Sequence, residues 1–203
     1  MSYIVLPSAV LSYPNLFVAK APPKSATAKY SCNLIFPEGT NLESIKQQIM
    51  QCAQAKWGNA MPANLQLPLK WAANTSKAND PNYAGKFFMS TSARTEHPPQ
   101  VIDEQKMPVD AQRGALLMYP GCMVVAAVRF YAYSNMGNNG VGCGLQAVMR
   151  VGDGVRIGES LDVQQAFANV APLVQPNAFA PAAIAGGQLP AQSQQPAGQT
   201  FNW

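Results

Sequence analysis

The stretch CMVVAAVRFYAYSNMGNNGVGCGLQAVMRV, residues 122–151, carries the clearest structural signal in the chain. Its first half, Cys122–Ser134, alternates apolar and polar side chains with the period of two that is typical of a half-buried strand. Its second half, Val141–Val151, alternates in the same way. Between them, Asn138-Asn139-Gly140 is a hairpin signal, because these residue types tolerate positive φ. The sequence therefore predicts a long two-stranded hairpin.

Each predicted strand divides its side chains between a core row and an outward row. The core rows are Val124, Ala126, Val128 and Phe130 in the first strand, and Val141, Cys143, Leu145, Ala147 and Met149 in the second. The outward rows hold Arg129, Tyr131 and Tyr133 in the first strand, and Gln146 and Arg150 in the second. A strand that faces only water would more often carry Thr, Glu, Lys and Ser on this side.

Shorter alternating segments extend the predicted β structure. Ala28–Phe36 places Tyr30, Cys32, Leu34 and Phe36 on one side and Lys29, Ser31 and Asn33 on the other. Gly85–Arg94 places Phe87, Met89 and Thr91 on one face and Lys86, Phe88, Ser90, Ser92 and Arg94 on the opposite face. Further strands are expected at Asn15–Ala21 and near Leu67–Trp71 and Gln100–Asp103.

One helix is expected between these strands. Thr40-Asn41-Leu42-Glu43 has capping-box spacing, with Thr40 as the cap. The apolar residues Leu42, Ile45, Ile49, Cys52 and Ala53 then recur at helical spacing, and Gly58 ends the run. Five or more strands with one capping helix favour a mainly β fold of the OB type, a five-stranded Greek-key barrel. A β-sandwich is the alternative architecture.

Charge divides the chain into two parts. Its 203 residues include 14 Lys and Arg and 10 Asp and Glu, a net charge of +4, and none of them lies beyond Asp162. The remaining segment is dominated by Ala, Gln, Pro and Gly and has few apolar side chains to bury. We therefore expect a folded domain over residues 1–162 and a flexible, uncharged tail over residues 163–203.

Signals for catalysis and metal binding are weak. The sequence contains no P-loop, and Gly140-Val141-Gly142-Cys143-Gly144 lies inside a predicted strand rather than between a strand and a helix. The single histidine, His97, precedes two prolines, and no G-x-S-x-G motif accompanies it. The four cysteines form no C-x-x-C pair and are expected to be reduced and packed as small apolar residues, with a single disulfide as the alternative. No apolar run approaches the ~18 residues of a membrane span. We expect no enzyme activity, catalytic residue, metal or cofactor, and no membrane partner.

Basic and aromatic side chains share the predicted outward faces. Single-stranded DNA requires this combination, because phosphates attract cations and unstacked bases pack on flat rings. The candidate DNA-binding residues are Lys29, Lys86, Phe88, Arg94, Arg129, Tyr131, Tyr133 and Arg150. The alternative is that the aromatic residues cover a second small core. Because these assignments rest on strand alternation, a one-residue change of register would exchange the two faces.

Several segments, taken in order, resemble a known family. They are Leu11-Ser12-Tyr13-Pro14-Asn15-Leu16-Phe17, Lys29-Tyr30, Leu34-Ile35-Phe36-Pro37, Gly85-Lys86-Phe87-Phe88, Ser90-Thr91-Ser92, Tyr119-Pro120-Gly121-Cys122, Phe130-Tyr131-Ala132-Tyr133, Gly140-Val141, Leu145 and Gly152-Asp153-Gly154-Val155-Arg156-Ile157-Gly158. Together, over residues 11–160, they resemble the bacteriophage single-stranded-DNA-binding proteins of the DUF2815 family, of the phage Enc34 type.

This resemblance implies an OB-fold similar to that of the T7-like phage single-stranded-DNA-binding proteins. It also implies a protein that coats single-stranded DNA during phage replication and recombination, in the cytoplasm of the bacterial host, without catalysis. The chain departs from many replication proteins of this kind because its end, Phe201-Asn202-Trp203, is aromatic but not acidic. Recruitment of phage or host replication proteins through the tail would then rest on apolar contacts. The alternative function is a phage structural or decoration protein built on a β-domain.

Overall fold

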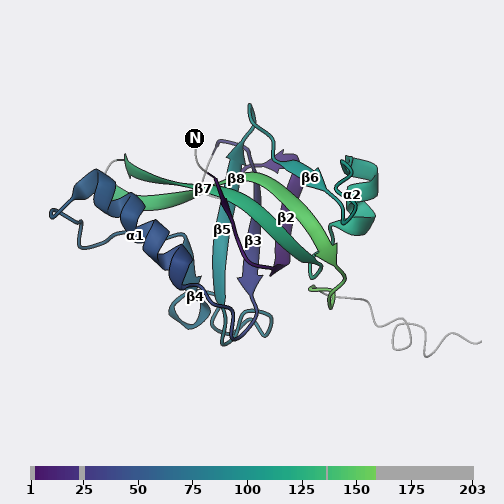
Figure 1. Ribbon diagram of the computed structural model, residues 1–203, viewed down its shortest axis with the longest axis horizontal. Helices are drawn as coiled ribbons and strands as arrows, with labels where there is room; N and C mark the ends of the chain where they lie inside the picture. Colours follow the sequence, from purple (N-terminus) through teal and green to yellow (C-terminus); the bar gives the residue numbers. More distant parts are fainter. Residues whose placement is uncertain (1–2, 23–25, 136, 159–203) are drawn as a thin grey trace, which may run out of the picture. The chain divides into compact units, whose positions relative to one another are not determined.

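The computed structural model describes residues 3–22, 26–135 and 137–158 (Figure 1). Its elements are β1 (Ile4–Val5), β2 (Ala9–Lys20), β3 (Lys29–Phe36), α1 (Glu43–Trp57), β4 (Leu69–Trp71), the 3-10 turn η1 (Ala72–Asn74), β5 (Phe87–Arg94), β6 (Gln100–Ile102), α2 (Ala111–Leu117), β7 (Met123–Asn135) and β8 (Asn138–Gly152). The predicted tail, residues 163–203, lies outside the described residues.

Five strands close into a barrel. Antiparallel pairs join β2 to β3, β3 to β5, β7 to β8 and β2 to β7, and a parallel pair joins β5 to β8. The succession β2-β3-β5-β8-β7 therefore returns to β2, which confirms the OB-type barrel and rejects the β-sandwich. The short strands extend this barrel, because β1 pairs with β7, β4 with β5 and β6 with β8.

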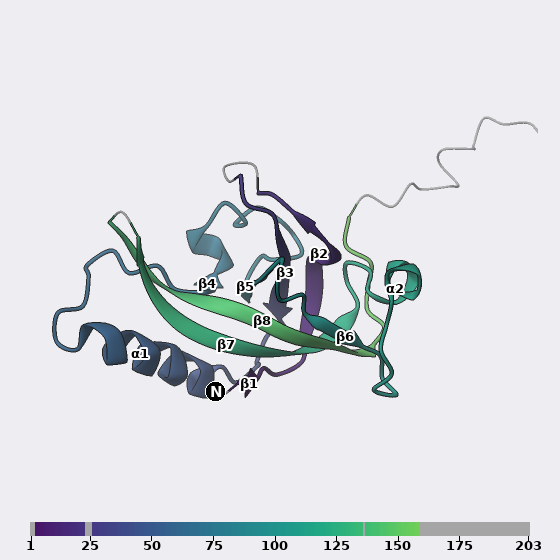
Figure 2. The same ribbon diagram turned by 90° about the horizontal axis from the view of Figure 1, so that it is seen from above.

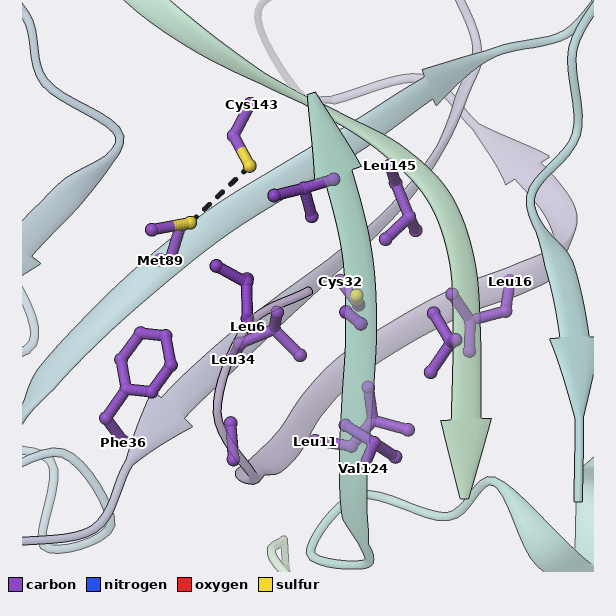
Figure 3. Close-up of a cluster of buried hydrophobic side chains, with 14 of the residues drawn as sticks. Leu6, Leu11, Leu16, Cys32, Leu34, Phe36, Met89, Val124, Cys143 and Leu145 are labelled. Carbon is purple, nitrogen blue, oxygen red and sulfur yellow. Dashed lines mark hydrogen bonds between the residues drawn. The ribbon is translucent and has the colours of Figure 1, made fainter. Parts of the chain in front are cut away.

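The barrel encloses one main core, which Figure 3 shows in close-up. Most of its side chains come from the predicted inward rows, among them Cys32, Leu34, Met89, Val124, Cys143 and Leu145. Leu11 also belongs to the core, because β2 begins at Ala9, six residues before the predicted strand Asn15–Ala21. Cys32, Cys122 and Cys143 are buried, as expected of small apolar residues, whereas Cys52 is half-buried. Burial raises the pKa of the Cys32 thiol to about 11, so this side chain is an uncharged packing group rather than a nucleophile.

Helix α1 covers the β7–β8 hairpin, against which it buries Ile45, Ile49 and Ala53 (Figure 2). The predicted capping box is wrong. The Thr40 hydroxyl donates to the Pro37 carbonyl at 2.7 Å, and Asn41 Oδ1 accepts from the Glu43 N–H at 3.0 Å. The amide side chain of Asn41 therefore binds the N–H of the first helical residue, whereas the N-cap residue, Leu42, makes no side-chain capping bond. The chain also forms a second helix, α2, which the sequence analysis did not predict.

The β7–β8 hairpin is confirmed, but its turn falls before the predicted Asn138-Asn139-Gly140. Asn135 pairs with Asn138, and Gly137 adopts a φ of 81° between them. Farther along, the register steps from Ala127 opposite Ala147 to Val128 opposite Leu145. This leaves Gln146 as the extra residue of a β-bulge.

The bulge exchanges the two faces of β8 beyond Gln146. Val148 and Arg150 are buried, whereas Ala147 and Met149 are only half-buried. The prediction that Ala147 and Met149 face the core and Arg150 faces outward is therefore wrong. The cause is one unpaired residue, which shifts every later side chain to the other side.

Neither helix among the described residues combines the length and the apolar composition needed to cross a bilayer.

Candidate nucleic-acid interface

Cross-strand pairing gathers cations on the outer face of the barrel. Lys29 lies opposite Lys20 on β2 and opposite Arg94 on β5, so three cations stand side by side across three strands. Directly paired residues carry their side chains on the same face. The sequence predicted Lys29 and Arg94 for this face but missed Lys20, whose position depends on an irregular register in β2.

The next outward row connects this cluster to β7. Ser31 pairs with Ser92, Ser92 pairs with Gly144, and Gly144 pairs with Arg129. Because the row crosses β3, β5, β8 and β7 without changing face, Arg129 projects on the same side as Lys29 and Arg94. Small side chains fill the space between the two groups of cations. The outer face therefore holds a shallow polar surface with positive charge at its margins.

Two tyrosine rings lie beside this surface on β7. Tyr131 pairs with Gly142 and Tyr133 pairs with Gly140, and their ring centroids are 6.4 Å apart. The rings rest directly on the backbone of β8, because a Cβ at Gly142 would collide with the Tyr131 ring and a Cβ at Gly140 would lie 2.6 Å from the Tyr133 hydroxyl. The alternating glycines thus accommodate the close approach of aromatic rings, not of a nucleotide loop.

Tyr131 remains accessible despite this packing. It is 47% exposed, and Tyr133 is half-buried. Partial burial raises the pKa of the Tyr131 hydroxyl, and the charge of Arg94 acts in the opposite direction. Arg94 therefore lies within electrostatic range of the Tyr131 ring. A flat aromatic surface and a cation occur together here, which are the two groups that a single-stranded nucleic acid requires.

Phe88 is covered rather than accessible on the outer face, so the prediction that it contacts DNA is wrong. It is 5% exposed and packs in a second small core with Ile35, Ala72 and Tyr83. The Tyr83 ring meets it edge-on at 5.1 Å. The Tyr83 hydroxyl donates to Ser12 Oγ at 2.9 Å and accepts from the Asn33 amide at 3.1 Å. Phe88 points outward as predicted, but the segment that carries Tyr83 covers it.

Lys86 shares an outward orientation with Arg94 but not its location. The two residues are eight positions apart in extended chain, which separates them by roughly 27 Å. The buried Phe88 lies between them, and the Lys86 ammonium donates to the Asn82 carbonyl at 3.2 Å. The structure therefore does not bring Lys86 together with the other predicted contacts.

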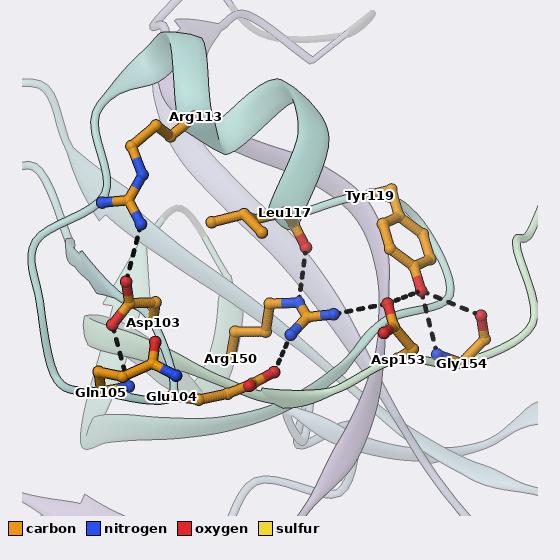
Figure 4. Close-up of polar contacts among 9 residues, drawn as sticks. All are labelled: Asp103, Glu104, Gln105, Arg113, Leu117, Tyr119, Arg150, Asp153 and Gly154. Atoms are coloured by element: carbon orange, nitrogen blue, oxygen red, sulfur yellow. Dashed lines mark hydrogen bonds and ion pairs between the residues drawn. The ribbon is translucent and has the colours of Figure 1, made fainter.

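Arg150 is the second predicted contact that the structure contradicts (Figure 4). Its guanidinium is buried and forms ion pairs with Glu104 and, at 2.5 Å, with Asp153. Its Nε donates to the Leu117 carbonyl at the end of α2, at 3.1 Å. Because three partners from three segments occupy this side chain, Arg150 joins α2 to the end of the barrel instead of facing solvent.

The carboxylate of Asp153 belongs to the same network. It accepts from the Tyr119 hydroxyl at 2.7 Å. This hydrogen bond and the Arg150 guanidinium lower the pKa of Asp153. Every polar group here has a partner within the protein, so the cluster is structural. No group of three or more His, Cys, Asp or Glu side chains among the described residues is arranged to hold a metal ion.

Comparisons with known proteins agree with this architecture. The model of a protein family described as "Enterobacter phage Enc34, ssDNA-binding protein" matches residues 2–174. Protein p50 of Acyrthosiphon pisum secondary endosymbiont phage 1 is 31% identical over 160 residues, which cover 71% of this chain and 80% of that protein.

Two solved structures share the fold. The single-stranded DNA-binding protein of bacteriophage Enc34, in complex with ssDNA, superposes with a TM-score of 0.69 at 22% identity and covers 77% of this chain and 89% of that chain. The single-stranded DNA-binding protein gp2.5 of bacteriophage T7 has a TM-score of 0.55 at 13% identity and covers 88% of this chain and 98% of that chain.

Proposed function

The chain belongs to the family of the Enterobacter phage Enc34 ssDNA-binding protein, and from this premise we propose that it coats single-stranded DNA without strong sequence preference. The observation that carries the proposal is the outer face of the barrel, where Tyr131 and Tyr133 lie beside a row of cations. Bases stack on the rings, and phosphates pair with the cations. The rings contact the faces of bases and the cations contact phosphates. Every nucleotide has both groups, so sequence preference is weak.

The proposed role is binding during phage DNA replication and recombination, in the cytoplasm of the bacterial host, and not catalysis. The aromatic rings and cations of the outer face supply stacking surfaces and positive charge, but they include no nucleophile paired with a base. The alternative of a structural or decoration protein receives no support from the family to which the chain belongs.

A titration with fluorescein-labelled oligo-dT of about 16 nucleotides, the upper end of OB-fold site sizes, tests the proposal. Lys20, Lys29, Arg94 and Arg129 are expected to contact phosphates. Four contacts at about −0.7 each predict that log K falls with log salt at a slope of roughly −3 between about 50 and 200 mM. A duplex of the same length is expected to bind much more weakly, because its bases are not available for stacking. A slope near zero, or equal affinity for the duplex, would contradict the proposal.

We also propose that residues 163–203 act in contacts with other proteins, phage or host replication proteins among them. The tail has no charged side chain, so it cannot compete with DNA for the cations of the barrel. Its aromatic residues Phe201 and Trp203 would make apolar contacts. A chain ended after Asp162 is therefore expected to bind oligo-dT within a few fold of the full chain. A large change in affinity would assign the tail to the DNA site.

A further inference from the structure

We propose that the DNA path continues beyond the two tyrosines into a groove beside β4, where Trp71 and Lys70 bind a further nucleotide. This inference rests on the proposed function. The groove has a volume of about 430 Å³, and Gln66, Leu69, Asn74 and Thr75 also line it. None of its lining residues is acidic, so nothing in the groove repels a phosphate.

The groove begins where the tyrosine surface ends. Residue 66 forms a parallel bridge with Gly140, and its carbonyl accepts from the Val141 N–H at 2.9 Å. A Cβ at Gly140 would lie 2.6 Å from the Tyr133 hydroxyl and 2.7 Å from the Gln66 carbonyl. Tyr133 and Gln66 therefore approach the same point on β8, and the surface is continuous between them. In Figure 2 the segment after β4 lies on the opposite side of the β7–β8 ribbon from α1.

Trp71 and Lys70 repeat the combination of groups that marks the tyrosine surface. Lys70 is exposed and pairs with Phe88, so it stands on the outer side of β5. The Trp71 ring is 36% exposed, and it contacts the Phe87 ring with the centroids 4.7 Å apart. Trp71 pairs with Phe87, whereas Lys70 pairs with Phe88, so the two side chains leave β4 on opposite faces, but both residues line the groove. A base can stack on the indole while Lys70 pairs with the adjacent phosphate.

The chain also offers a control for charge. Lys106 is exposed in the loop between β6 (Gln100–Ile102) and α2 (Ala111–Leu117). Figure 1 shows these two elements at the end of the barrel away from β4. Replacing Lys106 changes the net charge by as much as replacing Lys70, but Lys106 lies outside the proposed path.

The test measures affinity for oligo-dT of increasing length, from about 4 to about 16 nucleotides, for the full chain and its Trp71→Ala, Lys70→Ala and Lys106→Ala variants. For the longer oligonucleotides we expect Trp71→Ala to bind about 5- to 150-fold more weakly than the wild type. Lys70→Ala should reduce the magnitude of the salt slope by about one. For the shortest oligonucleotides that bind, both variants should match the wild type. Lys106→Ala should match it at every length.

Each other outcome has a definite meaning. Equal losses at all lengths would overturn the groove, since Trp71 would then act through the barrel or the tyrosine surface. No loss at any length, with wild-type binding intact, would also overturn it and leave the proposed function standing. Failure of the wild type to bind oligo-dT of any length would overturn the proposed function itself. If Trp71→Ala fails to fold, the Lys70→Ala variant still tests the groove, because Lys70 is exposed and its replacement does not disturb the core.

Discussion

Replacing Tyr131 by alanine is expected to weaken oligo-dT binding by about 1–3 kcal/mol, and replacing Tyr133 by a similar amount. Each ring provides a flat surface for a base, and Tyr131 is the more accessible, at 47% exposure. The double variant should lose more than either single variant but less than their sum, because ring centroids only 6.4 Å apart belong to one surface. Fluorescence anisotropy at constant salt measures all three losses.

The control for these variants is Leu116→Ala. Leu116 is 74% exposed on α2, and α2 lies at the end of the barrel away from the turn of the β7–β8 hairpin (Figure 1). Its replacement should leave the affinity for DNA unchanged. The melting temperatures of the Tyr131 and Tyr133 variants should remain close to that of the wild type, since both rings lie outside the barrel core. Unfolded variants, or folded variants with wild-type affinity, would refute the role of the two rings.

Replacing Arg150 by methionine is expected to reduce the free energy of unfolding by about 1–2 kcal/mol and to leave DNA affinity unchanged. Removing one partner of a buried ion pair often costs about 3–5 kcal/mol, but solvent screens Glu104 and Asp153, whose side chains are 40% and 80% exposed. Urea denaturation measures the loss. Arg113→Met is the matched control, because that guanidinium is 51% exposed in its pair with Asp103 and should contribute less than about 1 kcal/mol.

The same network predicts a dependence on pH. The pKa of Asp153 is lower in the folded state than in the unfolded state, so its contribution is fully present above the ordinary Asp pKa of about 3.9. This contribution is lost as the pH falls through the folded-state pKa. On acidification, the free energy of unfolding of the Arg150→Met variant should fall by less than that of the wild type. If it instead bound DNA more weakly with unchanged stability, Arg150 would be a DNA contact after all.

The barrel strands were predictable because their alternation is local. Two of the errors have non-local causes. The bulge at Gln146 leaves the spacing of the apolar residues intact, so only its pairing with β7 shows that Arg150 turns inward. Phe88 has the orientation that its strand predicts, but Tyr83 and its neighbours cover it from a distant part of the fold. By contrast, α2 has a readable signal, since Asp110 accepts from the Arg113 N–H at 2.8 Å as an N-terminal cap.

The candidate site was predictable in part, because alternation within each strand is local. Tyr131, Tyr133 and Arg129 occupy one outward row of a single strand, and Lys29 and Arg94 occupy outward rows of two others. The register between strands is needed to place these rows side by side and to add Lys20. Lys70 and Trp71 lie in a three-residue strand, β4, which is too short for its two faces to be recognised without its partner β5.

Ultraviolet cross-linking of the full chain to bromodeoxyuridine-substituted oligonucleotide, followed by mass spectrometry of the peptides, tests the central claim most directly. Stacked bases react with the side chains that they touch. Cross-links are expected at Tyr131 or Tyr133, on the outer face of β7, and they should be lost when unlabelled oligo-dT is added in excess. Cross-links confined to α1, at Met50 or Trp57, with none on β7, would show that DNA binds the opposite side of the hairpin and would contradict the account.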